Sequence, residues 1–191
     1  MNALMQPKLT LDAFLAWENE QLEKHEFHRG EVFAMGAARR VHGCVVTNLN
    51  RHLGNQLGKS SFGVFVAGMK VQIDDATVLY PDLFVTCDRA DLATDMIFRS
   101  PTLVIEVLSP STQAYDRSAK FALYRRIPAL QEYILVDPDT RRVEAFRRGA
   151  DNLWVLHDMS EADTLVAASV DARVAMADVF DGIDPPADTA V

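Results

Sequence analysis

The hydrophobic and polar residues of the chain alternate with two different periods. Where apolar residues recur every three or four positions, the pattern predicts amphipathic helices, at about residues 11–25, 41–57 and 113–126. Thr10 is a suitable N-cap for the first helix, Gly58 closes the second, and Pro128 stops the third.

Strands are predicted elsewhere, because the remaining apolar runs are short and show no helical period. They cover residues 62–68, 69–74, 77–87, 103–108 and 130–138. Two hairpins are also predicted, one turning at Arg29-Gly30 and one at Gly149, and a short strand with a helical turn ends the fold at 174–180. The mixture predicts an α/β fold of the α+β type with a mixed central sheet. A single domain over 9–182 is expected, with flexible termini at 1–8 and 183–191.

Composition and charge narrow the classes of function. The chain has 191 residues and is 49% hydrophobic, which is enough for a sizeable core, and its net charge of −8 argues against a broad nucleic-acid-binding surface, although not against a local basic groove. No apolar run approaches the roughly 20 residues of a membrane span, and the first residues lack a signal-peptide layout. Cys44 and Cys87 have no metal-ligand spacing and are interpreted as reduced core residues. A cytoplasmic protein with no membrane partner is expected.

An acidic residue interrupts the most apolar of the predicted strands. Glu106 stands between Ile105 and Val107 in PTLVIEVLSPST, where an ionised carboxylate is costly unless a cation or hydrogen bonds compensate it. Because side chains alternate across a sheet, Glu106 shares a face with Val104 and Leu108. The simpler alternative is a buried acid paired with an arginine or with backbone amides.

A second acid, Asp82, follows Tyr80-Pro81 in the preceding strand. Consecutive strands are usually neighbours, so Asp82 and Glu106 are expected within several ångströms of each other. Two carboxylates this close repel each other unless a cation lies between them. Oxygen ligands with open positions for water suit Mg²⁺ or Mn²⁺, so the pair predicts a divalent-cation site. The alternative for Asp82 is a structural turn after proline.

The third predicted helix supplies a cation. Asp116, Lys120 and Tyr124 follow one another at intervals of four residues, so they lie on one stripe of that helix. A short loop joins this helix to the strand of Glu106, so Lys120 can point its ammonium at the two acids. Asp116 is a candidate for orienting Lys120, whereas the two residues could also be a simple surface pair. Tyr124 is interpreted as a half-buried packing residue.

Several motifs, taken in order, resemble a known family. They are HEFHRGEVFAMG, His42 at the start of the second helix, YPDLFV, PTLVIEVLSPST, the helix of Lys120, and LQEYILVDP. Together they resemble the Uma-two family of restriction-endonuclease-like proteins in the PD-(D/E)XK nuclease superfamily, over roughly residues 9–182. The resemblance implies a restriction-endonuclease-like core and metal-assisted hydrolysis of phosphodiester bonds, with DNA as the expected substrate.

The resemblance also implies roles for individual residues. Asp82 and Glu106 would hold Mg²⁺ or Mn²⁺, and Lys120 would orient or deprotonate the attacking water. In the usual motif the lysine stands two residues after the glutamate, where this chain has Leu108. Lys120 therefore takes the role from another element. His42 could contact a phosphate, although a structural role at the helix start is the simpler interpretation.

An N-terminal acid commonly completes such a site, and the chain offers two candidates. Glu26 and Glu31 lie on either side of the Arg29-Gly30 turn and are expected to have opposite parity. Glu26 is favoured as a metal ligand because it precedes the apolar Phe27.

Two classes of function remain open, a metal-dependent nuclease and an inactive nuclease-fold module that acts in binding or assembly. A basic patch beside the acids would favour the nuclease, and its candidate residues are Arg29, Arg39, Arg40, Lys70, Arg99, Arg117, Arg125 and Arg126. A homodimer is expected, because two copies of one site can cut both strands of a duplex. The hairpin around Gly149 would contribute apolar contacts from Phe146, Trp154 and Leu156.

Overall fold

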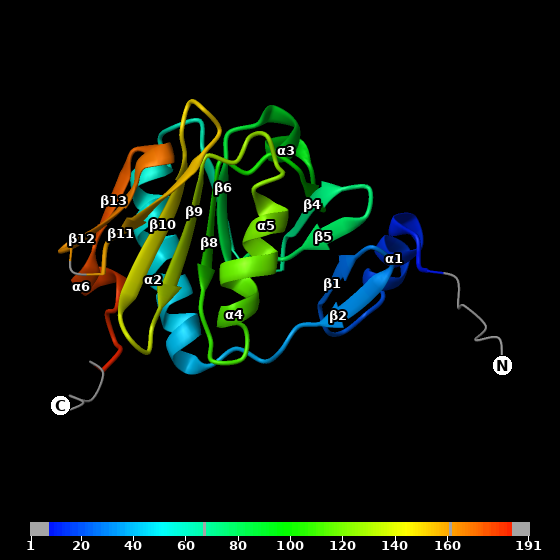
Figure 1. Ribbon diagram of the computed structural model, residues 1–191, viewed down its shortest axis with the longest axis horizontal. Helices are drawn as coiled ribbons and strands as arrows, with labels where there is room; N and C mark the ends of the chain where they lie inside the picture. Colours follow the sequence, from blue (N-terminus) through cyan, green and yellow to red (C-terminus); the bar gives the residue numbers. More distant parts are fainter. Residues whose placement is uncertain (1–7, 67, 161, 185–191) are drawn as a thin grey trace.

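A six-stranded mixed sheet forms the centre of the molecule, which is described here from a computed structural model of residues 8–66, 68–160 and 162–184 (Figure 1). Its strand order is β11-β10-β9-β8-β6-β3. The bounds are β3 (Gly63–Val66), β6 (Leu83–Thr86), β8 (Leu103–Val107), β9 (Glu132–Asp137), β10 (Arg142–Arg148) and β11 (Trp154–Asp158). Strands β8 and β9 are parallel, and the other pairs are antiparallel.

Helices cover both faces of this sheet. Helix α2 (Arg40–Leu57) packs through Val45, Leu49 and Leu53 against Leu103, Ile105 and Val107 of β8. On the other face lies a continuous helical segment made of α4 (Gln113–Tyr115), the π-helical turn η1 (Asp116–Lys120) and α5 (Phe121–Tyr124). Its aromatic residues join a second core that contains Val104 and Leu108. The predicted alternation of β8 is confirmed, and Glu106 shares its face with Val104 and Leu108, toward the segment that carries Lys120.

A second sheet of five strands, in the order β2-β1-β5-β4-β7, lies beside the first (Figure 1). Its strands are β1 (His25–His28), β2 (Glu31–Ala34), β4 (Lys70–Asp74), β5 (Thr77–Leu79) and β7 (Ile97–Phe98). Arg29 and Gly30 both have positive φ, 50° and 89°, and make the predicted two-residue turn between β1 and β2. Helix α1 (Leu11–Glu18) packs Phe14 on Phe27 of this hairpin.

The remaining described elements are short. They are α3 (Arg89–Ala93), the pair β12 (Thr164–Ala167) and β13 (Ala172–Ala175), the 3₁₀ turn η2 (Ala168–Val170) and α6 (Met176–Val179). Of the predicted flexible ends, residues 1–7 and 185–191 lie outside the described residues.

Two predicted elements were wrong in extent. The first helix ends at Glu18 and not near residue 25, because Asn19 caps it and the chain turns so that Glu18 accepts the backbone N–H of His25. Leu22, which falls within the predicted helix, is fully exposed. The strand predicted at 77–87 is two strands in two sheets, since Tyr80-Pro81-Asp82 carries the chain from β5 to β6.

Other predictions need smaller corrections. Cys87 is exposed and Cys44 is half-buried, so neither is a fully buried core residue. Tyr124 is completely buried and not half-buried. Phe146 and Trp154 are partly buried against Phe121 of the same chain.

Candidate active site

Asp82 and Glu106 lie next to each other, as the strand order predicts. Strand β6 pairs with β8 with Leu83 opposite Ile105, so Asp82, just before β6, comes beside Glu106. The backbone N–H of Asp82 donates to Oε2 of Glu106 at 3.4 Å, and the N–H of Val107 donates to Oδ2 of Asp82 at 2.8 Å. Each carboxylate is thus fixed by the backbone of the other strand.

Lys120 brings its ammonium to three carboxylates. Its Nζ lies 3.0 Å from Oε1 of Glu106, 3.2 Å from Oε1 of Glu26 and 3.7 Å from Oδ1 of Asp116. The residue is buried, so Lys120 and Asp116 are not the surface pair of the simpler interpretation. The π-helical turn between Asp116 and Lys120 is a feature that the sequence pattern did not indicate, and such turns often occur at functional sites.

His42 contacts the other end of the acid pair. It lies in the first turn of α2, and its Nε2 is 3.0 Å from Oδ2 of Asp82. This contact raises the pKa of His42. Burial alone would raise the pKa of Asp82, but His42 and the N–H of Val107 lower it, which keeps Asp82 ionised. In this structure His42 therefore pairs with an acid.

Acidic side chains outnumber basic ones in this cluster. Glu26, Asp82, Glu106 and Asp116 surround Lys120 and His42. Burial raises the pKa of Glu106 well above its usual range, against the opposing effect of Lys120. Burial would lower the pKa of Lys120, but Glu106 and Glu26 raise it well above its usual value, so the ammonium stays charged.

Whether these residues suit a divalent cation can be tested on the geometry. In the described part of the chain, no three His, Cys, Asp or Glu side chains are arranged to hold a metal ion directly. Lys120 lies between Glu26 and Glu106, and His42 holds Asp82. Oε1 of Glu106, however, is buried and accepts no hydrogen bond from the described residues. The cluster offers carboxylate oxygens of the kind that Mg²⁺ and Mn²⁺ prefer, but a divalent cation would have to displace the Lys120 ammonium from Oε1 of Glu106.

The two candidate N-terminal acids occupy very different positions. Glu26 is buried beside Lys120, and its Oε1 also accepts the backbone N–H of Tyr80 at 3.2 Å. Glu31 is exposed on the edge strand β2. The expected opposite parity was wrong, because His28 pairs with Glu31 and so places Glu31 on the same face of the hairpin as Glu26. The two acids differ instead in their strand, because Glu26 lies on β1 and Glu31 lies on the edge strand β2.

Glu18 and Tyr115, near the cluster, were not identified from the sequence, and Tyr124 was identified as a packing residue only. Glu18, buried at the end of α1, accepts the Tyr80 hydroxyl at 2.9 Å and lies 3.0 Å from Nδ1 of His25. Burial raises the pKa of Tyr115 to about 12, with a further rise from Glu26. The hydroxyl of Tyr124 is buried without a hydrogen bond among the described residues.

Three of the eight residues of the predicted basic patch are paired with acids, and three others contact neutral groups. Arg39 pairs with Asp139 at 2.7 Å, Arg117 with Glu144, and Arg126 with Asp74. Arg40 donates to the carbonyl of Gly182, Arg99 to the side chain of Gln72, and Arg125 lies over the ring of Phe121. Arginines that are engaged in this way are poor candidates for holding a nucleic acid.

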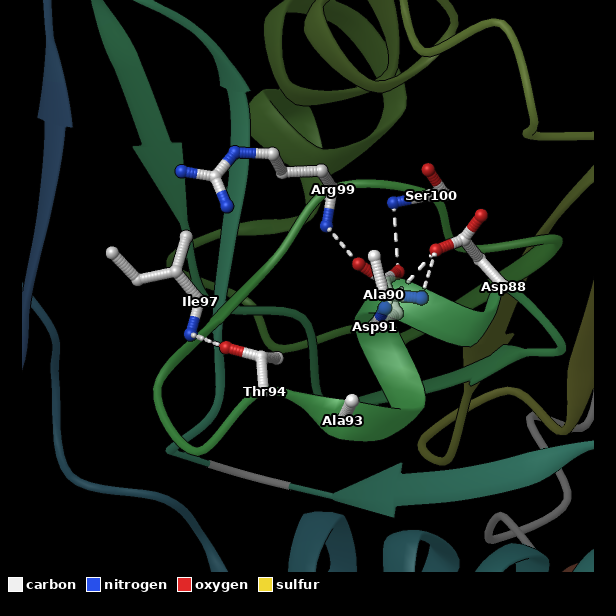
Figure 2. A pocket seen from close by; sticks show the side chains of 8 residues that line it. All are labelled: Asp88, Ala90, Asp91, Ala93, Thr94, Ile97, Arg99 and Ser100. Carbon is white, nitrogen blue, oxygen red and sulfur yellow. Dashed lines mark hydrogen bonds between the residues drawn. The ribbon is translucent and has the colours of Figure 1, made fainter.

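A separate hollow beside α3 has a structural explanation. Its lining includes Asp88, Asp91, Arg99 and Ser100 and none of the predicted site residues (Figure 2). The buried carboxylate of Asp91 accepts the backbone N–H groups of Arg99 and Ser100, both at 2.8 Å, and Asp88 caps α3. These acids therefore fasten the loop after α3 and the start of that helix.

Comparisons with known proteins agree with the fold. A family model, Uma2, described as "Putative restriction endonuclease", matches residues 11–176. Two uncharacterized proteins of Synechocystis sp., slr1290 and sll1609, are each 34% identical over 93% and 79% of this chain and 94% and 87% of their own lengths. A crystal structure described as a "putative nuclease belonging to DUF820" from Anabaena variabilis superposes with a TM-score of 0.70 at 20% identity, covering 90% of this chain and 97% of that one. No helix in the described residues is long and apolar enough to cross a membrane.

Proposed function

Since this chain belongs to the Uma2 family, whose model is described as "Putative restriction endonuclease", we propose that it is a metal-dependent nuclease that hydrolyses phosphodiester bonds in DNA. The fold of the DUF820 structure agrees with this class. The observation that carries the proposal is the buried lysine between two glutamates, Glu26 and Glu106, with Asp82 beside them. A buried cluster in which acidic side chains outnumber basic ones is expensive to keep for stability alone.

The roles of the residues follow from their positions. Asp82 and Glu106 would hold Mg²⁺ or Mn²⁺, with Glu26 completing the oxygen ligands. When bound, such an ion polarises the phosphate and lowers the pKa of a coordinated water. His42 keeps Asp82 ionised and oriented, and the N–H of Val107 fixes the same carboxylate. Lys120, when released from Glu106, would orient the attacking water or stabilise charge on the phosphate, and Asp116 would guide the freed ammonium.

The test is a cleavage assay with matched substrates. Purified protein is mixed in excess with labelled duplex DNA or with RNA of the same sequence, in Mg²⁺, in Mn²⁺ and in EDTA. Metal-dependent cleavage that is lost in Asp82→Ala but kept in Asp139→Ala, an exposed acid that pairs with Arg39, supports the proposal. Equal cleavage by Asp82→Ala and the parent would point to a contaminant and contradict it.

A second candidate function is a catalytically inactive module of the same fold. It is favoured by one observation, that Lys120 already contacts the carboxylates that a metal ion would need. An inactive protein would show neither metal-dependent cleavage nor Mn²⁺ binding that depends on Glu106.

We further propose that the active form is a homodimer, because two related sites cut the two strands of a duplex. Strand β11 is an edge of the six-stranded sheet, and it carries exposed Val155 and Leu156, with Leu153 exposed just before it. An exposed apolar edge strand is suited to pairing with a second copy. Light scattering at micromolar concentration should give twice the chain mass, and Leu156→Lys should give a monomer. A monomeric parent would contradict the dimer.

A further inference from the structure

Two lysines lie close to the candidate active site without an acidic partner. Lys70, the first residue of β4, is only 5% exposed, and its ammonium donates one hydrogen bond, to Oδ1 of Asn19 at 2.8 Å. Lys24 is exposed, and its Nζ lies 6.0 Å from the ring centroid of Tyr80. Neither lysine forms an ion pair within the described residues.

The ammonium of Lys70 is poorly compensated for a buried charge. It has three N–H groups, and Asn19 is its one hydrogen-bond acceptor among the described residues. Burial lowers the pKa of Lys70, and the nearby charge of Lys24 lowers it further. The carboxylate of Glu18 is close enough to oppose this effect, but its oxygens are already bonded to Tyr80 and His25. An anion between the two ammonium groups would compensate the charge of both lysines.

These lysines are connected to the acid cluster through Tyr80. Strand β4 pairs with β5 with Val71 opposite Leu79, so one step further along brings Lys70 beside Tyr80. Lys24 lies over the ring of the same tyrosine, and the backbone N–H of Tyr80 donates to Glu26. Asn19 and Lys24 are exposed, so a ligand can approach this point from solvent.

We propose that Lys24 and Lys70, together with Asn19, bind a backbone phosphate of the nucleic acid next to the phosphate that is cleaved. This inference rests on the proposed nuclease function and names the contact that holds its substrate. Phosphate accepts hydrogen bonds from ammonium and amide N–H groups, and lysine binds it as a point charge.

The charge distribution of the molecule makes such a contact necessary. The chain carries a net charge of −8, and the acid cluster itself repels a polyanion. Arg39, Arg117 and Arg126 are each paired with an acid, so they add little attraction. The lysine pair supplies local positive charge on the other side of Tyr80 from Glu26, where it contacts none of the acids of the cluster directly.

The experiment measures the salt dependence of binding. Fluorescence anisotropy of a labelled DNA duplex, with EDTA present to prevent metal-assisted cleavage, is followed over a range of salt for the parent, Lys24→Ala, Lys70→Met and Lys59→Ala. Each lost phosphate contact lowers the slope of log K against log salt by about 0.9. Lys24→Ala and Lys70→Met should each show this loss, and Lys59→Ala, an exposed lysine just beyond the end of α2, should keep the parental slope. An RNA duplex of the same sequence shows which nucleic acid supplies the phosphate.

The outcomes separate this inference from the proposed function. Because Lys70 is buried, thermal melts first check that Lys70→Met folds, and Lys24→Ala provides a second variant whose side chain is exposed. If the parent cuts DNA but Lys24→Ala and folded Lys70→Met keep the parental slope, the phosphate site is wrong and the nuclease stands. If the parent binds with a slope that falls in both variants but does not cut, the site stands and catalysis fails. A parent that binds neither duplex overturns both.

Discussion

The ammonium nitrogen of Lys120 lies 3.0 Å from Oε1 of Glu106, although the two side chains come from a π-helical turn and a buried strand. Oε1 of Glu106 accepts no hydrogen bond of good geometry from the described residues, so its contact with Lys120 is electrostatic. Lys120 therefore compensates the charge that a divalent cation would otherwise compensate. Metal binding and the Lys120–Glu106 contact are expected to compete.

Lys120→Met should abolish cleavage and tighten the binding of Mn²⁺. The neutral side chain removes the competing cation from Glu26 and Glu106, whereas the group that acts on the attacking water is lost. Without metal the variant should be less stable by about 3 kcal/mol, because breaking one side of a buried ion pair leaves uncompensated charge. A surface pair would have contributed only about 0.2–0.5 kcal/mol. Mn²⁺ should restore much of the loss.

Urea melts with and without Mn²⁺ measure the stability, and single-turnover cleavage measures the activity of the folded variant. Lys59→Met, at an exposed position, is the control for a lost lysine. Parental cleavage rates in folded Lys120→Met would remove Lys120 from the mechanism.

The carboxylates should differ in their effect on metal affinity. Asp82→Asn and Glu106→Gln each remove a charged ligand from the centre of the cluster, so each should weaken Mn²⁺ binding at least tenfold, which is about 1.4 kcal/mol. Glu26→Gln should also weaken it, whereas Glu31→Gln should not, because Glu31 is exposed on β2. Calorimetric titration of the four variants measures this order. Equal weakening in Glu26→Gln and Glu31→Gln would contradict the assignment of Glu26.

The ion pair of His42 and Asp82 should make stability depend on pH when no metal is present. The folded-state pKa of Asp82 is lowered from 3.8. Its contribution to the free energy of unfolding is therefore present above pH 3.8 and is lost as the pH falls through the lowered pKa. The folded-state pKa of His42 is raised from 6.5, so its contribution is present below that value and is lost as the pH rises through the raised pKa. The pair therefore stabilises most between these limits.

In EDTA, the difference in free energy of unfolding between the parent and His42→Asn should be largest near about pH 5.5 and small near about pH 9. Urea melts at both values measure it, and His157→Asn, on β11 away from the site, should show no such difference. A difference that is as large at high pH as at low pH would mean that His42 acts through packing and not through charge.

Local sequence pattern predicted much of the fold. The alternation in β8 placed Glu106 on the correct face, the glycine turn placed the first hairpin, and the order of β6 and β8 brought Asp82 beside Glu106. These features depend on short-range rules of periodicity and turn geometry.

What the pattern did not predict depends on distant contacts. Glu18 has no local reason to be buried, and its partner Tyr80 is 62 positions away. The apolar run 77–87 reads as one strand, but Pro81 cannot donate to a sheet ladder, and the chain changes sheets there. The π-helical turn before Lys120 also leaves no periodic signal, because only its hydrogen bonds differ from those of an α-helix.

Glu18 should act as a positioning residue for Glu26. It is buried and holds the Tyr80 hydroxyl and the backbone N–H of His25, which are adjacent in space to Glu26. In Tyr80→Phe, a buried carboxylate oxygen of Glu18 loses a hydrogen-bond donor. This loss should lower the free energy of unfolding by about 1–3 kcal/mol. Because Tyr80 also donates its backbone N–H to Glu26, this variant should retain that contact and bind Mn²⁺ nearly as tightly as the parent.

Glu18→Ala removes the acceptor of both groups, so Tyr80 and His25 lose their common anchor. Mn²⁺ binding should weaken several-fold in Glu18→Ala and should recover in part in Glu18→Gln, which can still accept the Tyr80 hydroxyl. Glu20→Gln, two residues further along and exposed, is the control. Urea melts and calorimetric titration together make the distinction, since a purely structural role would lower stability in Glu18→Ala while leaving the Mn²⁺ affinity of the folded protein unchanged.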